Sequence, residues 1–279
     1  GGFGFGESSN FNSNGVLGTT TLGPGSIFID AGPDVAIDCS SNGGCTDLTA
    51  TFLETFETSS AYTVESIDYA PPYAFDGLAN SLWLQDDSWS EVDTLPFDFC
   101  FFGNLEQEFQ VGSNGVIRFD VDPGDVGSGS NGWSFSENLP NSTNSTLSEA
   151  NVFTPVHDID PSAGSGLEEI GYEVLGEYPN RVLVVSYFDV PMFSGGCNAL
   201  LATHMAVFYE FSNVIEIYIQ NKPDCPTGGQ FFRNAVLGIQ NNEGTVAYVP
   251  PGRNTSDSPW TATNEAWRFA PDGVETYAF

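Results

Sequence analysis

Short segments in which apolar and polar residues alternate run along the chain and predict β-strands. In residues 214–220, Ile215, Ile217 and Ile219 fall on one side of an extended backbone, and Glu216 falls on the other. A strand that rests one face on a core requires this period of two residues. Similar runs predict extended segments at residues 27–29, 35–38, 48–56, 62–67, 95–102, 108–111, 116–121, 152–156, 171–175, 181–190, 205–211, 235–240 and 245–249. No segment of normal helix length shows a 3.6-residue period, so the pattern predicts an all-β protein.

Turn-forming residues join these segments into hairpins. Residues 112–115 read Gly-Ser-Asn-Gly between two strand-like runs, and Ser212-Asn213 links the runs on either side of it. Hairpins packed around one core predict an antiparallel β-sandwich with long loops. Residues 1–26 are rich in Gly, Ser and Asn and predict a flexible N-terminal arm, whereas residues 124–151 predict long exposed loops. We therefore expect an arm over 1–26 and a β-sandwich domain over 27–279.

The chain is acidic because cations are scarce. Its 279 residues include 37 Asp and Glu but 6 Lys and Arg, which gives a formal net charge of -31. Such a chain lacks the basic patches that neutralise phosphates, so a nucleic-acid partner is excluded. Docking on an anionic membrane is disfavoured for the same reason. No apolar run approaches the roughly 18 residues of a membrane helix, so we expect no direct membrane insertion.

The five cysteines predict two disulfides and one free thiol. Cys39 and Cys45 bracket a flexible loop that a disulfide could close. Cys197 and Cys225 sit at nearly equal distances from the turn at Ser212-Asn213, so a hairpin brings them together at its open end. Cys100 remains, and we expect it to be an unpaired, buried small side chain. Two disulfides point to an extracellular or surface location.

The segment His157-Asp158-Ile159-Asp160 is the main candidate for chemistry. Alternation places Asp158 and Asp160 on one strand face, where their oxygens could share a hard cation such as Ca²⁺. The same carboxylates could instead cap the turn before Pro161, or serve a secreted hydrolase. No nucleophile motif accompanies His204, which is expected to be a hydrogen-bonded strand residue. We expect the chain not to be an enzyme.

Aromatic residues in polar surroundings are the candidates for ligand binding. Trp133 and Phe135 lie in the Gly- and Asn-rich stretch, and Trp260 follows a Ser-Pro pair. Exposed rings could stack on sugars, although such residues can also cover the ends of a core. Arg253 could contact a ligand or, as we expect for the scarce cations of an acidic chain, pair with a carboxylate.

Three motifs stand in the middle of the chain. Residues 95–103 read LPFDFCFFG, residues 111–119 read VGSNGVIRF, and residues 153–161 read FTPVHDIDP. Together they resemble nidogen-like extracellular domains over about residues 90–270, and the resemblance implies an extracellular β-domain. Family members lead us to expect a second cysteine shortly before the GSNG turn. Those positions hold Phe109 and Gln110, so the resemblance leaves Cys100 without that partner.

A second set of runs comprises AGPDVAIDC, YAPPYAF, ATHMAVFYE and WTATNEAWRF. These runs are similar to modules of long surface proteins of Bacteroidota, and the first of them resembles the opening strand of PKD/Ig-like modules. Proteins with such modules are exported by the type IX secretion system, and many are gliding-motility or adhesion proteins of the SprB type. The resemblance implies a secreted bacterial cell-surface protein.

A recognition role agrees best with these features. The chain is one unrepeated unit with long loops, which favours an adhesion module over a structural spacer or a filament or coat subunit. A hydrolase should bring titratable groups together from several segments, and the sequence shows one such cluster. We expect a surface polysaccharide, a protein ligand or other subunits of a surface assembly as partner.

Overall fold

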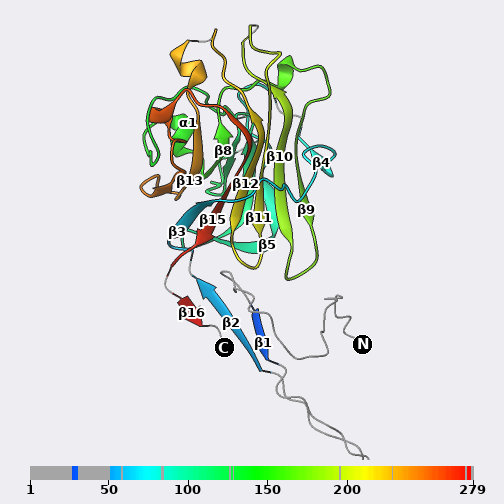
Figure 1. Ribbon diagram of the computed structural model, residues 1–279, viewed down its shortest axis with the longest axis vertical. Coiled ribbons are helices and arrows are strands. Elements are labelled where there is room, and N and C mark those ends of the chain that lie inside the picture. Colours follow the sequence, from blue (N-terminus) through cyan, green and yellow to red (C-terminus); the bar gives the residue numbers. More distant parts are fainter. Residues whose placement is uncertain are drawn as a thin grey trace, which may run out of the picture.

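The computed structural model describes residues 27–30, 51–57, 59–82, 85–125, 127, 129–194, 196–227, 229–273 and 275–277. Two large antiparallel sheets dominate the described part, which confirms the all-β sandwich (Figure 1). The seven-stranded sheet has the order β3 (Tyr62–Ser66), β15 (Ala262–Pro271), β12 (Ile215–Lys222), β11 (Leu201–Tyr209), β10 (Val182–Pro191), β9 (Glu169–Leu175) and β4 (Asn80–Ser81). The six-stranded sheet has the order β14 (Ala247–Tyr248), β13 (Val236–Gln240), β8 (Val152–Val156), β7 (Val116–Arg118), β6 (Asn104–Gly112) and β5 (Asp93–Phe101).

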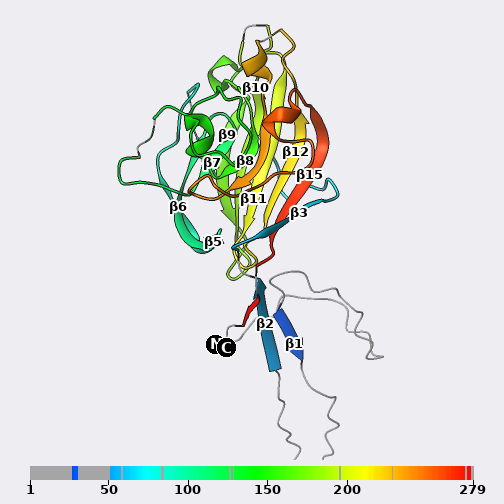
Figure 2. The same ribbon diagram turned by 90° about the vertical axis from the view of Figure 1, so that its left-hand side faces the viewer.

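Shorter elements lie at the two ends of this sandwich. A third sheet of β1 (Ile27–Asp30), β2 (Thr51–Glu57) and β16 (Glu275–Tyr277) extends from one end. The 3₁₀-helices η2 (Pro161–Ala163) and η3 (Gln230–Arg233) lie at the other end, which is uppermost in Figures 1 and 2. We call this upper end the loop end. The remaining helices are α1 (Ser145–Ser148) and η4 (Thr255–Asp257), so the described helices are all short, as predicted.

The main core fills the space between the two large sheets. Ile215, Ile217 and Ile219 are fully buried there, which confirms the period-two prediction for β12. Aromatic rings from both sheets pack against each other, as in the edge-on contact of Phe99 with Phe208 at 5.6 Å between centroids. Large flat rings bury much apolar area, so the dense aromatic run before Gly103 supplies a major part of this core.

The β11–β12 hairpin places the predicted disulfide. Phe208 pairs with Ile215 near the turn, and the register holds as far as the pair His204 and Ile219, after which it shifts before Thr203. Beyond that end Cys197 and Cys225 are bonded, with 5.7 Å between their Cα atoms, and both are buried. Cys100 is free, as predicted, but it is half-buried rather than buried. Residues 1–26, the segment 35–38 and the Cys39–Cys45 pair lie outside the described residues.

The prediction of exposed loops over residues 124–151 holds for the mainly irregular backbone and for many polar residues, but not for the apolar side chains of that stretch. Phe135, Leu139 and Leu147 are buried on the outer face of the six-stranded sheet, where they pack with Phe153 and other apolar residues. The isolated apolar side chains of this Gly- and Ser-rich segment thus anchor it to the sheet. A few hydrophobic residues suffice to hold an irregular segment on a sheet. The polar composition of residues 124–151 therefore gave no sign that this segment covers the six-stranded sheet.

The seven-stranded sheet is also covered on its outer face, and it contains a strand that was not predicted. Phe75 and Leu78 pack there on Val184, Met205 and neighbouring side chains. Strand β15 joins this sheet between β12 and β3, although its sequence gave no clear alternation. Its burial is irregular along its length, which explains why a period-two search misses it.

Candidate functional site

The chain crosses from one sheet to the other at the loop end. Strand β8 belongs to the six-stranded sheet, but the residues that follow it bond to the end of β10 in the opposite sheet. The N–H of Asp160 donates to the carbonyl of Pro191 at 2.8 Å, and the N–H of Phe193 donates to the carbonyl of Asp158 at 3.0 Å. This crossing closes the sandwich and places Asp158 at its corner.

Asn114, in the turn between β6 and β7, holds three segments at this corner. Its side-chain amide donates to a carboxylate oxygen of Asp87 at 2.9 Å and lies within 3.3 Å of the carbonyl of Asn131. Its side-chain oxygen accepts the N–H of Ile159 at 3.1 Å. The next residue, Gly115, has φ +86°, and an added Cβ would lie 2.1 Å from the carbonyl oxygen of Pro155. The Gly-Ser-Asn-Gly turn is therefore a structural hub as well as a hairpin turn.

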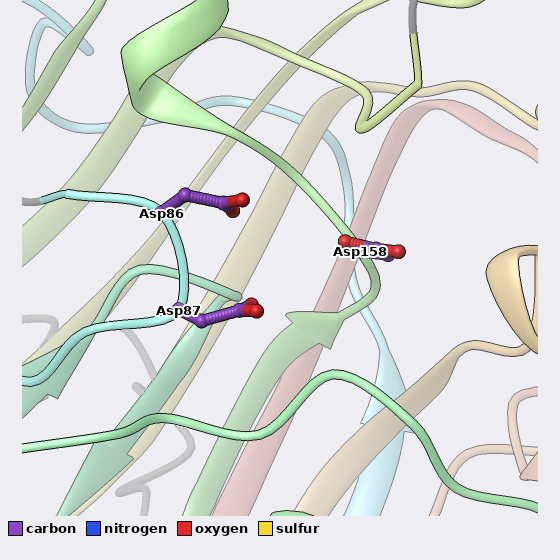
Figure 3. Close-up of side chains that lie close together, drawn as sticks. All are labelled: Asp86, Asp87 and Asp158. Atoms are coloured by element: carbon purple, nitrogen blue, oxygen red, sulfur yellow. The ribbon is translucent and has the colours of Figure 1, made fainter.

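Three carboxylates face one another beside this hub, and we call them the acidic trio: Asp86, Asp87 and Asp158 (Figure 3). Asp86 and Asp87 come from the segment between β4 and β5, whereas Asp158 follows β8. Each offers one oxygen, and these oxygens all lie within 4.8 Å of one another. Asp158 is 3% exposed, and its Oδ2 atom is buried without a hydrogen-bond partner.

The surroundings of the acidic trio disfavour its negative charge. Burial is the main cause that raises the pKa of Asp158 to about 8, and neighbouring carboxylates add to the effect. Burial likewise raises the pKa of Asp86 to about 6, again with help from nearby carboxylates. The pKa of Asp87 is raised by burial, against which the hydrogen bond from Asn114 acts. The charged neighbours behind these shifts are all acidic, so the trio faces no protein cation among the described residues.

The predicted pair of Asp158 and Asp160 separates into two roles. Asp160 caps η2, since its Oδ1 accepts the N–H of Ser162 at 2.8 Å and the hydroxyl of the same residue at 2.5 Å. The capping role foreseen for these carboxylates therefore holds for Asp160. The carboxylates that gather around Asp158 are instead Asp86 and Asp87. A sequence pattern could not link them to Asp158, because they are distant in the chain.

Both histidines, His157 and His204, are buried. His204 is fully buried, lies 3.1 Å from the hydroxyl of Thr154, and packs on the ring of Tyr187. The Nδ1 atom of His157 lies 3.2 Å from the sulfur of Met192. Burial lowers the pKa of each imidazole, that of His204 to about 3. His204 is thus the strand histidine that the sequence indicated.

Three aromatic rings stack at the same end of the sandwich, and we call them the aromatic stack: Trp133, Phe193 and Phe232. The ring of Phe232 lies between the other two. Its plane is 7° from that of Trp133, with 4.9 Å between centroids, and 11° from that of Phe193, at 5.9 Å. All three residues are half-buried, so the stack is partly open to solvent. The N–H of Phe193 donates to the carbonyl of Asp158 at the crossing between the sheets. Trp133 directly follows Asn131 and Gly132, whose carbonyls accept from the side-chain amide of Asn114.

The other predicted binding residues have structural roles. Phe135 is 1% exposed and Trp260 is 7% exposed, so the prediction that they are exposed anchors is wrong. Phe135 packs under the covering segment, and the indole N–H of Trp260 donates to the carbonyl of Ala235. Arg253 pairs with Glu265 and lies over the ring of Trp260, at 4.8 Å from the centroid, which is the pairing expected for a scarce cation.

A polar hollow of about 430 Å³ lies on another part of the surface. Asp120, Asp122 and Glu149 line it together with Arg118. The guanidinium of Arg118 pairs with Asp125 at 2.9 Å and lies 4.4 Å from the ring centroid of Trp89. Since a protein cation already occupies this acidic hollow, it differs from the acidic trio.

The family comparison agrees with the three motifs of residues 95–103, 111–119 and 153–161. A family model described as NIDO related matches residues 59–279, which takes in both large sheets. The chain belongs to the NIDO-related family. This confirms the nidogen-like resemblance and extends it beyond residues 90–270, while the assignment to Bacteroidota adhesins stays a prediction. Neither a search of curated proteins nor a search of solved structures returned a match.

Membership of the NIDO-related family indicates an extracellular module of a larger protein, since nidogen-like domains are typically extracellular. Among the residues that the structure describes, no helix has the length and apolar character needed to span a membrane. The family does not assign a ligand, so the functional argument rests on the loop end itself.

Proposed function

We propose that this NIDO-related domain is an adhesion or recognition module that holds a surface polysaccharide at its loop end. The observation that carries the proposal is the aromatic stack of Trp133, Phe193 and Phe232, which is partly open to solvent. Rigid rings provide a large contact area and lose little conformational entropy on binding. Sugar rings present apolar faces of similar size, so the stack suits a saccharide.

The position of the stack supports this role. The third sheet extends from the opposite end of the sandwich (Figure 2), so the loop end faces away from it. The stack is assembled from three separate segments, and Asn114 bonds one of them to the framework. A site on loops that a rigid sandwich positions can vary without unfolding the core.

The charge of the chain narrows the ligand class. With a formal charge of -31, the domain repels acidic polymers, so a neutral polysaccharide is the better partner. The proposal includes no catalytic step, because of the two carboxylates that a hydrolase would use, Asp158 is 3% exposed and Asp160 caps η2. In a long bacterial surface protein, such a module would support surface attachment or gliding.

The test compares the attachment of beads that carry the domain. The native domain, Trp133→Ala and Tyr178→Ala are each coupled to beads and applied to glass, to a neutral polysaccharide coat and to an acidic polysaccharide coat. Tyr178 is a matched control, because it is 79% exposed and lies before the start of β10, whereas Phe193 lies after its end. We expect Trp133→Ala to weaken attachment to the neutral coat at least about tenfold, and Tyr178→Ala to leave it unchanged.

All three proteins must melt at the same temperature for the comparison to count. Equal attachment of the native domain and Trp133→Ala, or attachment of neither, would contradict the role of the aromatic stack. The role of a structural spacer or filament subunit would then replace recognition. Preference for the acidic coat would contradict the charge argument.

A further inference from the structure

We infer that the acidic trio of Asp86, Asp87 and Asp158 is a calcium site that ties the segment before β5 to the end of β8. Calcium binds oxygen ligands at about 2.3–2.6 Å, so two ligands on opposite sides of one ion lie roughly 4.6–5.2 Å apart. The three carboxylate oxygens lie within 4.8 Å of one another. A single ion can therefore contact all three, and Figure 3 shows the side chains pointing toward a common space.

The second observation is a buried carboxylate oxygen that lacks a partner. Asp158 is 3% exposed, and its Oδ2 atom accepts no hydrogen bond. The Oδ1 atom of Asp86 is also buried and without a partner. A buried carboxylate without hydrogen bonds or counterion is unfavourable, and native proteins satisfy such groups with a donor, a cation or a metal.

No lysine or arginine of this protein is free to supply that cation. All six Lys and Arg residues lie in the described part of the chain. The five arginines pair with other carboxylates, and Lys222 donates to the carbonyl of Trp260 at 2.8 Å while it is 1% exposed. A cation that balances the ionised acidic trio therefore has to come from outside the chain.

The donor set favours calcium over other common metals. The trio offers only carboxylate oxygens, whereas zinc and most transition metals prefer His or Cys ligands. Magnesium requires a tighter octahedral shell and retains most of its water. Calcium accepts irregular oxygen shells of six to eight ligands, so water can complete a site with three carboxylates. Extracellular modules bind calcium with Kd of about 10⁻⁴–10⁻³ M, which suits this family.

Bound calcium would also affect the neighbouring binding surface. Asp87 shares the amide of Asn114 with the carbonyls of Asn131 and Gly132, which directly precede Trp133. An ion that fixes Asp87 would therefore stabilise the base of the aromatic stack. The calcium site itself is argued from the acidic trio alone and does not depend on the proposed polysaccharide ligand.

The test measures calcium binding and thermal stability on the same proteins. The native domain, Asp158→Asn, Asp87→Asn and the control Glu177→Gln are titrated with CaCl₂ by calorimetry after treatment with chelator. Glu177→Gln removes the same charge from an exposed carboxylate in the turn before β10, at the opposite end of that strand. We expect one ion per native chain and per Glu177→Gln chain, and at least tenfold weaker binding for the two Asp variants.

Melting temperatures provide a readout that a misfolded variant cannot imitate. At about 10 mM calcium and matched ionic strength, the Tm of the native domain should rise by roughly 3–10 °C over that in chelator. Asp158→Asn replaces a buried carboxyl group whose Oδ2 atom has no hydrogen-bond partner, so its Tm in chelator should not fall below the native value. Because the variant lacks one of the three carboxylate ligands, its Tm should not respond to calcium.

Three results would overturn the assignment. The first is a native domain that binds no calcium and melts at the same temperature in chelator. The second is an Asp158→Asn variant that binds calcium as the native domain does. The third is an equal rise in Tm with magnesium, which would show that the site does not select calcium.

Discussion

Removal of the Cys197–Cys225 disulfide should destabilise the domain by an amount that follows from its position in the chain. The bond joins residues separated by 28 positions. Closing a loop of that length removes about 12 cal/mol/K of entropy from the unfolded chain, or about 3.6 kcal/mol at 25 °C. Since typical domains are stable by about 5–15 kcal/mol, this is a substantial share. The Tm should fall by about 7–14 °C.

The assay is urea unfolding of the native domain and of Cys197→Ala/Cys225→Ala, followed by tryptophan fluorescence. Both cysteines are buried, so the variant also loses two packed sulfur atoms. Native protein reduced with dithiothreitol retains both atoms and measures the cross-link alone. The free thiol provides the control, because Cys100→Ala breaks no bond and should change the free energy of unfolding by less than about 1 kcal/mol.

The result that would refute this reasoning is a small loss in both arms. If the double variant and the reduced protein each lost less than about 1 kcal/mol, the cross-link would not be restricting the unfolded chain. A loss confined to the double variant would assign the effect to packing of the sulfur atoms rather than to loop closure.

Three further predictions concern the core near the loop end. Gly115→Ala should destabilise the domain by more than about 3 kcal/mol, because its Cβ would lie 2.1 Å from the carbonyl oxygen of Pro155. The control Gly252→Ala is also at positive φ but has open space around it, so it should cost about 1 kcal/mol. Similar Tm values for the two variants would contradict the steric argument. Burial lowers the pKa of Lys222 to about 7, so below that pH the folded domain holds a buried charge. Lys222→Met should therefore raise the free energy of unfolding by about 1–2 kcal/mol at pH 6, and by less as the pH rises above 7. A variant that is less stable than the native domain at pH 6 would refute this. Burial lowers the pKa of His204 to about 3, so between pH 6.5 and 3 the unfolded chain binds a proton that the folded chain does not. Stability should therefore fall as the pH falls through that window, by up to about 1.4 kcal/mol per pH unit more than in His204→Asn, and parallel stability curves would show that His204 does not contribute.

The sequence predicted features that depend on neighbouring residues. The alternation in residues 214–220 located a buried strand face, and the distances of Cys197 and Cys225 from one turn located a disulfide. The motif around the GSNG turn indicated the family. Each of these inferences rests on local spacing, which the extended backbone translates directly into positions in space.

The sequence could not predict contacts that depend on the packing of distant segments. Asp86 and Asp87 reach Asp158 only because the chain crosses between sheets after β8, and no spacing rule reports that crossing. The sequence indicated Trp133 as a candidate binding residue, but not the rings that stack with it, because Phe193 and Phe232 come from two other segments. Phe135 and Trp260 were misassigned because a polar sequence context does not show whether an aromatic ring is covered.

The measurement that tests the central claim most directly is oxidative footprinting of the domain while it is attached to a neutral polysaccharide coat. The free domain serves as reference, and oxidation of each side chain is read by mass spectrometry. The proposed function predicts that attachment protects Trp133, Phe193 and Phe232 and leaves Tyr178, which is 79% exposed near the opposite end, as reactive as before. Protection at Tyr178 without protection of the aromatic stack, or unchanged oxidation of the stack, would contradict a binding surface at the loop end.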